Sequence, residues 1–283
     1  MDTPVTASEH CDRPHENGVN LAGRLALVTG ATSGIGWSIA RALALQGADL
    51  VVHEYTDQHT GELVADLTRL GRKAVAFTGD FSVPGGGGRL ASELSAAGLS
   101  PDIVVHNASL QVRKPLDELR AEDVAAQMHV GYGAVVELVG ATVGGMKERG
   151  WGRILTVGSV QQLRPNPALT VYANVKAALA NFVQAIAAVY APHGITANNI
   201  APGMIDTSAT RFILDNPVRN ADMLRQIPAG YVGEPQDCAG LAAFLCGPDG
   251  RYITGQTIFI DGGLGLNTKA SFIAQGAAGE GPL

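Results

Sequence analysis

The sequence predicts a single α/β domain in which helices cover both faces of a doubly wound parallel sheet. Short apolar runs rich in β-forming residues alternate with longer amphipathic segments, such as 35–46 and 171–190, that are long enough to be crossover helices. Strands connected in this way form parallel sheets with right-handed crossovers. Seven strands are expected, at residues 25–29, 49–53, 74–78, 103–106, 154–157, 196–200 and 257–260.

The expected strands and crossovers place one domain at residues 21–263, between a tail at 1–20 and another at 264–283. Both tails show little hydrophobic periodicity, so we expect them to be ordered only by contact with another subunit. The first expected strand contains a continuous apolar run at 25–28, which is typical of a strand buried on both faces. The glycine run at 85–88 is too short to link two domains and is expected to form a surface loop.

Composition argues against several classes of function. The net charge of −6 provides no basic surface for a phosphate backbone, so no nucleic-acid partner is expected. Cys11, Cys238 and Cys246 lack zinc-site spacing, so no metal site is expected, and the thiols are predicted to be free in a reducing compartment. No stretch of about 18 apolar residues is found, and the polar N-terminus lacks a signal pattern. We therefore expect a cytoplasmic protein without a membrane segment.

A glycine-rich loop follows the first expected strand and leads into the first expected helix. In this loop Gly30, Gly34 and Gly36 allow a tight turn and a close approach of the backbone to a pyrophosphate. Ser33 and Ile35 lie between them. The N-terminus of the helix presents unpaired N–H groups and the positive end of its dipole to that anion. Glycine-rich turns alone are weak evidence, but this strand–turn–helix context predicts a dinucleotide site.

Glu54 follows the second expected strand, about twenty residues after the glycines, where a carboxylate can bind both ribose hydroxyls of an adenosine. It would repel a 2′-phosphate, and neither Ser33 nor Tyr55 is a cation that would attract one. NAD is therefore favoured over NADP, although Glu54 could also be only a solvated charge. Ligands of open α/β sheets bind at the carboxyl ends of strands, and the residues that end the third and fourth strands are Asp80, Phe81, Asn107, Ala108 and Ser109.

Three further residues have the spacing of a catalytic set. Ser159 follows the fifth expected strand, and Tyr172 and Lys176 lie one turn apart on one face of the next helix. A phenol ionises at about pH 10, and both the Lys176 ammonium and the positive nicotinamide of an oxidised cofactor would favour the phenolate. Ser159 can then hold a substrate oxygen while Tyr172 gives or takes its proton. Lys176 can also reach the nicotinamide ribose.

Together these motifs resemble those of the short-chain dehydrogenase/reductase family over residues 23–263. The resemblance also rests on Pro202-Gly203 with Thr207, and on a segment at 252–256 that leads to 261–263. It implies a seven-stranded Rossmann fold, a nicotinamide dinucleotide that lies across the strand ends, and a homo-oligomer, either a tetramer or a dimer. It further implies cofactor contacts from Val130, Tyr172, Lys176, Pro202, Gly203, Ile205 and Thr207.

Two positions depart from the family pattern. Ser109 stands where glycine is usual, which narrows the floor beside the nicotinamide or adds a hydroxyl to it. Gly131 stands where the family usually has an asparagine that anchors a water linked to the lysine. His129 is two residues away and faces elsewhere on a helix, whereas Gln127 lies on the same face as Gly131. We expect either Gln127 or a water bound to the exposed backbone to replace the asparagine.

The retained Ser159, Tyr172 and Lys176 predict an NAD(P)-dependent enzyme that interconverts a secondary alcohol and a ketone. The resemblance implies that segment 204–231 covers the substrate, and loops of this length usually serve function. Polar side chains near the expected mouth favour a sugar, polyol or oxo acid, although surface solvation explains most of them equally well; they are Gln111, Arg113, Gln161, Gln162, Arg164, Arg211, Arg219 and Arg225. The main alternative is a 3-oxoacyl-thioester reductase. An idle dinucleotide-binding sensor or assembly subunit is the alternative that Gly131 leaves open.

Overall fold

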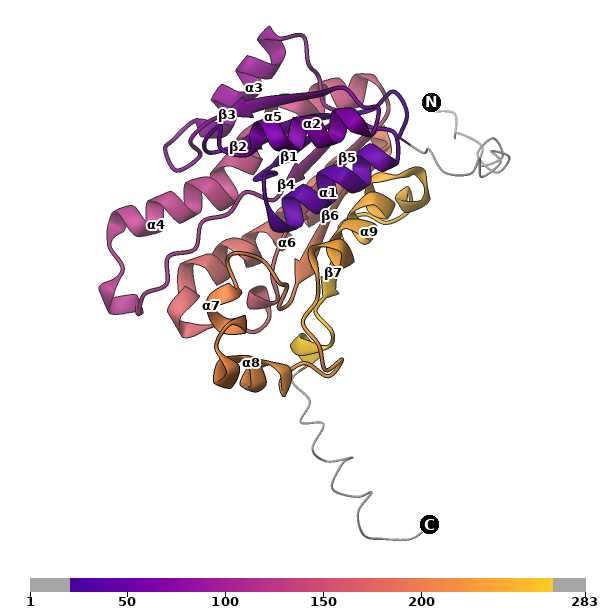
Figure 1. Cartoon of the computed structure of the whole chain (residues 1–283). Helices are drawn as coiled ribbons and strands as arrows, with labels where there is room; N and C mark the ends of the chain where they lie inside the picture. The colour runs from indigo at the N-terminus through magenta and orange to yellow at the C-terminus, as the bar shows by residue number, and fades with distance from the viewer. Residues whose placement is uncertain (1–20, 267–283) are drawn as a thin grey trace, which may run out of the picture.

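A seven-stranded parallel sheet forms the centre of the structure, a computed structural model that describes residues 21–266 (Figure 1). The strand order β3-β2-β1-β4-β5-β6-β7 changes direction between β1 and β4, which places the topological switch point between these two strands. The predicted doubly wound Rossmann fold is therefore confirmed. The strands are β1 Leu25–Thr29, β2 Asp49–Glu54, β3 Ala74–Thr78, β4 Ile103–His106, β5 Gly152–Val157, β6 Ile195–Pro202 and β7 Thr257–Ile260.

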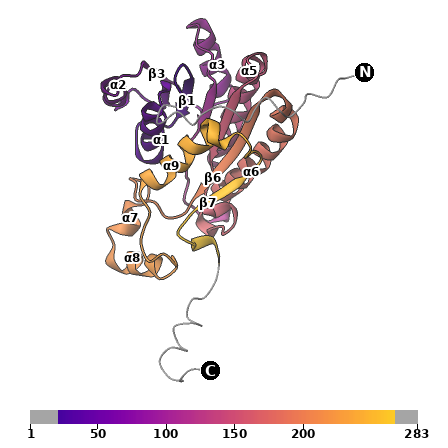
Figure 2. The same ribbon diagram turned by 90° about the vertical axis from the view of Figure 1, so that its right-hand side faces the viewer.

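Helices cover both faces of the sheet. Helices α1, α2 and α9 pack on one face and α3, α5 and α6 on the other (Figure 2). The helices are α1 Gly34–Leu45, α2 Thr60–Arg69, α3 Gly86–Ala96, α4 Ala121–Met128, α5 Ala134–Glu148, α6 Thr170–Tyr190, α7 Arg211–Leu214, α8 Pro217–Leu224 and α9 Pro235–Cys246. Short α7 and α8 lie on the segment between β6 and α9, below the sheet in Figure 1.

The apolar run in β1 is explained by burial on both faces. Ala26 and Val28 belong to the core beneath α1 and α9, and Leu27 belongs to the core beneath α3 and α5. All three side chains are fully buried. The carboxyl end of β1 is thereby fixed at the centre of the sheet, from which the glycine-rich loop departs.

The glycine run at 85–88 differs from its expected role as a surface loop. Gly86 begins α3, and both Gly86 and Gly87 are buried. A Cβ on Gly87 would lie 2.4 Å from the Ala134 carbonyl oxygen, so glycine is needed where α3 crosses α5. The physical reason is close helix packing, which the local composition does not reveal.

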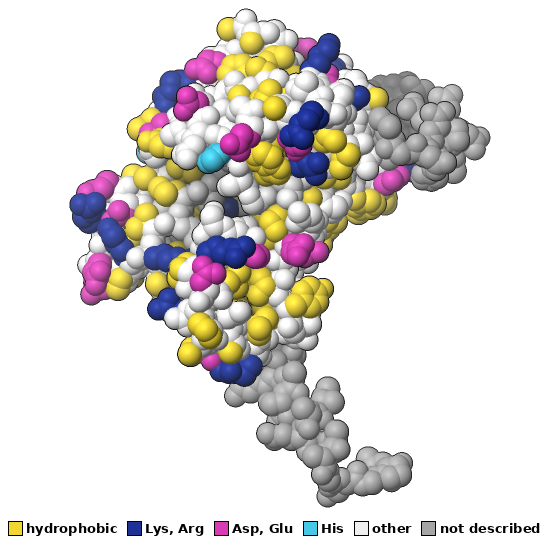
Figure 3. Space-filling model, in the orientation of Figure 1, with side chains coloured by type: hydrophobic (Ala, Val, Ile, Leu, Met, Phe, Trp, Pro, Cys, Tyr) yellow, Lys and Arg dark blue, Asp and Glu magenta, His cyan; other side chains and the backbone are white. Residues whose placement is uncertain are grey.

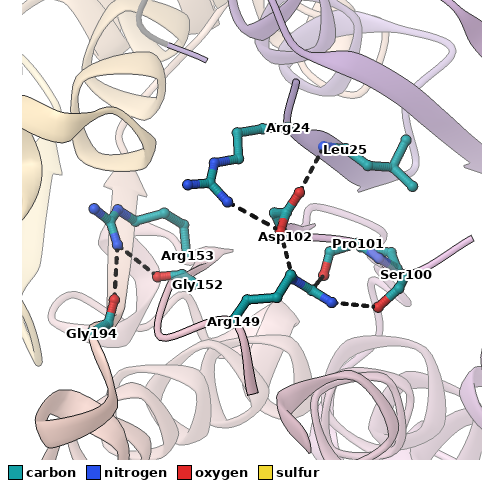
Figure 4. Close-up of polar contacts among 9 residues, drawn as sticks. All are labelled: Arg24, Leu25, Ser100, Pro101, Asp102, Arg149, Gly152, Arg153 and Gly194. Atoms are coloured by element: carbon teal, nitrogen blue, oxygen red, sulfur yellow. Dashed lines mark hydrogen bonds and ion pairs between the residues drawn. The ribbon is translucent and has the colours of Figure 1, made fainter. Parts of the chain in front are cut away.

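Charged side chains hold together the amino-terminal ends of several strands (Figure 4). The Asp102 carboxylate accepts the Leu25 backbone N–H at 3.1 Å and pairs with Arg149 at 2.8 Å and Arg24 at 3.5 Å. Arg153 of β5 donates to the carbonyl oxygens of Gly152 at 2.8 Å and Gly194 at 3.2 Å. These contacts join the amino ends of β1, β4, β5 and β6, far from the opposite edge where a ligand would bind.

One segment of the described chain, Pro167–His193, is long and apolar enough to cross a membrane by length and composition, where the sequence was expected to contain none. Most of it is α6, whose Leu179 and Val183 are fully buried in the core beneath the sheet. We interpret it as a core helix. The expected tail at 1–20 lies outside the described residues, as does most of that at 264–283; Leu264–Leu266 form a short 3-10 turn.

Candidate active site

A cavity of about 870 Å³ lies at the carboxyl ends of the strands. Figure 3 shows this face of the molecule, which is hollowed above the α7–α8 segment. Every residue predicted to bind cofactor or to act in catalysis lines the cavity except Gly36: they are Gly30, Ser33, Gly34, Ile35, Glu54, Asp80, Phe81, Asn107, Ala108, Ser109, Val130, Ser159, Tyr172, Lys176, Pro202, Gly203, Ile205 and Thr207. The fold therefore brings these residues together at the carboxyl ends of the strands, as the sequence predicted.

The glycine-rich loop forms a cradle that side chains would fill. Gly30 has a φ of +59°, and a Cβ there would lie 2.9 Å from Ala108 Cα. Gly36 lies behind the loop, where a Cβ would lie 2.1 Å from the Gly30 carbonyl oxygen. That oxygen accepts a 2.7 Å hydrogen bond from Asn107 Nδ2. Gly36 thus supports the loop through close packing and does not line the cavity.

The N-terminus of α1 faces this cradle. The N-cap Ser33 makes no side-chain capping bond, and the first turn contains no acidic residue. The first N–H groups of the helix are therefore available to an anion, which the helix dipole also favours. Loop and helix together fit the pyrophosphate of a dinucleotide.

The other end of the cradle carries a fixed carboxylate. Glu54 accepts a 2.7 Å hydrogen bond from Thr32 Oγ1 and a 2.9 Å bond from the Tyr55 N–H. Among the described residues that line the cavity, Arg113 and Lys176 are the only Lys or Arg side chains. Lys176 belongs to the catalytic set, and Arg113 lies close enough to Tyr172 to act on its pKa. The wall beside Glu54 therefore contains no such cation.

Ser159, Tyr172 and Lys176 meet at the opposite end of the cavity. Ser159 and Tyr172 are each 8% exposed and Lys176 is 2% exposed. Ser159, Gln111 and Ser109 lie beside the Tyr172 hydroxyl, close enough to act on its pKa. Lys176 Nζ donates a 2.6 Å hydrogen bond to the Val157 carbonyl oxygen and lies 5.4 Å from the centre of the Tyr172 ring. The three side chains predicted from their spacing are therefore neighbours.

Comparison with known proteins gives a consistent assignment. The family model described as enoyl-(acyl carrier protein) reductase matches residues 30–265. The chain is 33% identical to the 3-oxoacyl-(acyl-carrier-protein) reductase FabG of Escherichia coli strain K12 over 246 residues, covering 87% of this chain and 99% of the relative. It is 34% identical to the 2-dehydro-3-deoxy-D-gluconate 5-dehydrogenase of Bacillus subtilis strain 168 over 246 residues, covering 86% and 95%. The protein belongs to the short-chain dehydrogenase/reductase family.

A solved structure extends this result. The gluconate 5-dehydrogenase of Burkholderia cenocepacia J2315, in complex with NADP and tartrate, matches with a TM-score of 0.82 at 32% identity, covering 88% of this chain and 98% of that one. This short-chain dehydrogenase/reductase is accordingly an oxidoreductase of CH–OH and keto groups that uses a nicotinamide dinucleotide. The alternative of an idle dinucleotide-binding subunit is not supported.

The electrostatics of the catalytic set differ from one expectation. Burial raises the pKa of Tyr172, against its hydrogen bonds and the positive charge of Arg113. Burial also lowers the pKa of Lys176 to about 7. Lys176 and an oxidised nicotinamide were expected to favour the phenolate; the side chains alone do not lower the Tyr172 pKa, because desolvation dominates both groups.

The polar side chains near the mouth separate into two groups. Gln111 and Arg113 line the cavity. Arg113 lies over the Phe212 ring at 4.6 Å, and its guanidinium donates to Gln111 Oε1 at 3.1 Å. The other candidates do not line the cavity: Arg211 pairs with Asp206, Arg225 with Asp222, and Arg164 donates to Leu264 and Gln226, while Gln161, Gln162 and Arg219 also lie outside it.

Gly131 has a neighbour that neither expectation named. The amide of Gln127 is already engaged, since it accepts from the Val112 N–H at 3.2 Å and donates to the Asp123 carbonyl oxygen at 3.0 Å. That Gln127 also replaces the missing asparagine stays a prediction, because these two bonds use one of its two amide hydrogens and one of the two acceptor positions of its oxygen. The backbone at Gly131 is buried rather than exposed, and its carbonyl oxygen lies 3.2 Å from His106 Nε2. Sequence reasoning missed His106, whose partner is 25 residues away along the chain.

Proposed function

We propose that the protein interconverts a secondary alcohol and a ketone on a small hydroxy or oxo acid, such as a sugar acid. Ser159, Tyr172 and Lys176 are the proposed catalytic residues. The observation that carries the choice of substrate is the position of Arg113. It lines the same cavity as Tyr172, and its positive charge acts to lower the Tyr172 pKa.

The proposed chemistry follows from the side chains that surround the Tyr172 hydroxyl. When bound, the nicotinamide supplies the acceptor or donor of a hydride. The Tyr172 phenolate would take the proton of the alcohol in oxidation, and the Tyr172 hydroxyl would return it to the substrate oxygen in reduction, while Ser159 holds that same oxygen. The cavity walls exclude water from these groups, since both are more than nine-tenths buried. Lys176 is too buried to be a surface charge, and it would hold the nicotinamide ribose.

Arg113 favours an anionic substrate over an uncharged one. Its guanidinium is held by Phe212 and Gln111, and no acidic side chain forms an ion pair with it among the described residues. Guanidinium groups bind carboxylates in a fixed, bidentate geometry. A carboxylate that reached Arg113 would place a nearby hydroxyl-bearing carbon beside Tyr172. Relatives that are named as acting on gluconate derivatives support the same substrate class.

The test compares an acid with an uncharged analogue. Gluconate and a polyol of the same chain length are oxidised with wild type, Arg113→Met and Arg211→Met, and kcat/KM is measured by reduced-nicotinamide absorbance. Arg113→Met should lower kcat/KM for gluconate by about 10- to 100-fold, the value of a hydrogen bond to a charged group, and leave the polyol unchanged. Arg211→Met is the control because Arg211 lies outside the cavity. Equal losses for both substrates would contradict the proposal.

The second candidate is a 3-oxoacyl-thioester reductase, which the description of the matching family model and the similarity to FabG favour. The two candidates are separated by assaying an acetoacetyl thioester with reduced cofactor beside the acid panel. A higher kcat/KM for the thioester than for every acid would favour this candidate. Its acyl chain also needs an apolar path, whereas Arg113 and Gln111 make this wall polar.

NAD is the proposed cofactor, in preference to NADP. The fixed Glu54 carboxylate would lie beside the adenosine ribose, and the cavity wall there has no Lys or Arg among the described residues. A 2′-phosphate would be repelled by it. The Burkholderia relative holds NADP, so the preference proposed for this chain must come from its own side chains.

A homo-oligomer in the cytoplasm is also proposed. β7 is an edge strand of the sheet, and exposed edges are usually covered by another element or chain. Nearby Tyr252 is 97% exposed, and Phe244 and Phe259 are also exposed. The buried thiols of Cys238 and Cys246 are free, which suits a reducing compartment. Light scattering of the purified protein tests the oligomeric state, and a monomer at micromolar concentration would contradict it.

A further inference from the structure

His106 is a buried histidine behind the catalytic set. It ends β4 and is 1% exposed. Its Nδ1 lies 3.3 Å from Thr29 Oγ1, and its Nε2 lies 3.2 Å from the Gly131 carbonyl oxygen. The imidazole thus connects the end of β1 to the segment between α4 and α5.

The hydrogen bonds of Thr29 fix the tautomer of His106. Thr29 Oγ1 accepts the backbone N–H groups of Asn107 and Ala108, each at 3.1 Å. Its own hydrogen is therefore left for His106 Nδ1, which acts as the acceptor. Nε2 then carries the proton and donates it to the Gly131 carbonyl oxygen. Both ring nitrogens are satisfied by a neutral imidazole.

The charges around His106 also keep it neutral. Burial lowers its pKa to about 3, and the titratable groups that act on it are Lys176 of α6 and His53 of β2, both of which lower it further. A protonated imidazole would face the Lys176 ammonium in a buried region, where like charges are costly. His106 is therefore a fixed donor to Gly131 at working pH.

Gly131 lies in a π-helical turn that packs against α6. The turn, His129–Gly133, joins α4 to α5. Such turns change the direction of backbone groups and are frequent at functional sites. A Cβ on Gly131 would lie 2.4 Å from Val175 Cγ1, so the absence of a side chain lets the turn approach Val175. That residue directly precedes Lys176 and follows Tyr172 by three positions.

We propose that His106 is a positioning residue. By holding the Gly131 carbonyl, it keeps the π-helical turn packed against Val175, and this packing fixes the positions of Tyr172 and Lys176 in the cavity wall. The chain of contacts runs from Thr29 through His106, Gly131 and Val175 to the catalytic helix. A shift of about 1 Å in such a support can cost about 100-fold in rate. This inference rests on the proposed catalytic residues but not on the identity of the substrate.

Two amide variants separate the two hydrogen bonds of His106. The side-chain nitrogen of glutamine reaches the position of Nε2, whereas the amide of asparagine reaches only that of Nδ1. His106→Gln should therefore keep the bond to Gly131 and retain kcat within about threefold, and His106→Asn should lose the bond and lower kcat by about 10- to 100-fold. Cofactor affinity, measured by calorimetry, should stay within about threefold in both. Equal kcat values, or a loss confined to cofactor affinity, would overturn the proposal.

A size exchange tests the same contact without changing His106. Gly131→Ala places a methyl group against Val175 and should lower kcat about tenfold or more, although alanine is the better helix former. Val175→Ala removes the opposing methyl groups, so the double variant should recover most of the lost rate. A silent Gly131→Ala, or a double variant no faster than it, would contradict the proposal. This pair also applies if His106→Asn does not fold.

A readout without substrate keeps this inference separate from the proposed function. The titration of Lys176 can be followed by NMR of protein with ¹³C-labelled lysine, even if no substrate of the panel is turned over. His106→Asn loosens the packing around Lys176, so the Lys176 pKa should rise from about 7 toward its ordinary value, and His106→Gln should leave it in place. An unchanged titration in His106→Asn would overturn the proposal.

Discussion

The Lys176 ammonium donates a 2.6 Å hydrogen bond to the Val157 carbonyl oxygen, at the end of the strand that leads to Ser159. The bond ties α6 to β5 in a region where Lys176 is almost fully buried. Burial lowers the pKa of Lys176 to about 7. A lysine with this pKa links the geometry of the site to the stability of the fold.

Stability should therefore depend on pH in a way that Lys176→Met removes. Between about pH 7 and pH 10.5 the unfolded chain holds a proton on Lys176 that the folded protein has released. Stability consequently rises with pH through this window, and the gain is lost as pH falls toward 7, with a limiting slope of about 1.4 kcal/mol per pH unit. The measurement is the free energy of unfolding by urea at several pH values, as the difference between wild type and Lys176→Met. A difference that does not change with pH would contradict the assigned pKa.

Gly36→Ala should weaken cofactor binding, although it adds only one methyl group and removes no polar contact. The added Cβ would lie 2.1 Å from the Gly30 carbonyl oxygen and 2.6 Å from Asn107 Nδ2, so the loop must move. Cofactor affinity should fall about tenfold or more, since the loop no longer fits the pyrophosphate. Gly61→Ala in α2 is the matched control, because its Cβ meets nothing within 4 Å and should stabilise the protein slightly. Calorimetry should show weak cofactor binding in Gly36→Ala alone. Equal cofactor affinity in the two variants would contradict this prediction.

Glu54 should decide the choice between NAD and NADP. Wild type is expected to have the higher kcat/KM with NAD, because the carboxylate repels a 2′-phosphate. Glu54→Ala should move the ratio of the two kcat/KM values toward NADP by about tenfold or more. Thr32→Val is a milder variant, which removes the 2.7 Å hydrogen bond that holds the carboxylate and should have a smaller effect. A wild-type preference for NADP, or an unchanged ratio in Glu54→Ala, would show that Glu54 is only a solvated charge.

The sequence predicts those parts of the fold and site that depend on local patterns. Apolar runs located the strands, and the order of strand, glycine loop and helix located the cradle around Gly30. The spacing of Tyr172 and Lys176 on one helix face was likewise sufficient to place them together. These features depend on neighbours along the chain, which periodicity reports directly.

The remaining features depend on segments that meet only in the folded protein. The contact of His106 with the Gly131 carbonyl joins a strand end and a π-helical turn 25 residues apart. A histidine at the end of an apolar strand gives no sign of its partner. The electrostatics were also missed, because burial outweighs the charge of Arg113 and the neighbouring polar side chains in setting the Tyr172 pKa. Burial depends on packing around the whole cavity.

The central claim is that Tyr172 transfers the proton of an alcohol or ketone held in this cavity. The most direct measurement is turnover of a panel of hydroxy acids, polyols and ketones by wild type and Tyr172→Phe, followed at the absorbance of reduced nicotinamide, with cofactor affinity measured in parallel. We expect cofactor-dependent turnover in wild type and a loss of about 10² to 10⁴-fold in Tyr172→Phe, the usual value of general acid–base catalysis, with cofactor binding nearly intact. Retention of more than about a tenth of wild-type turnover by Tyr172→Phe, with the chemical step rate-limiting, would contradict it.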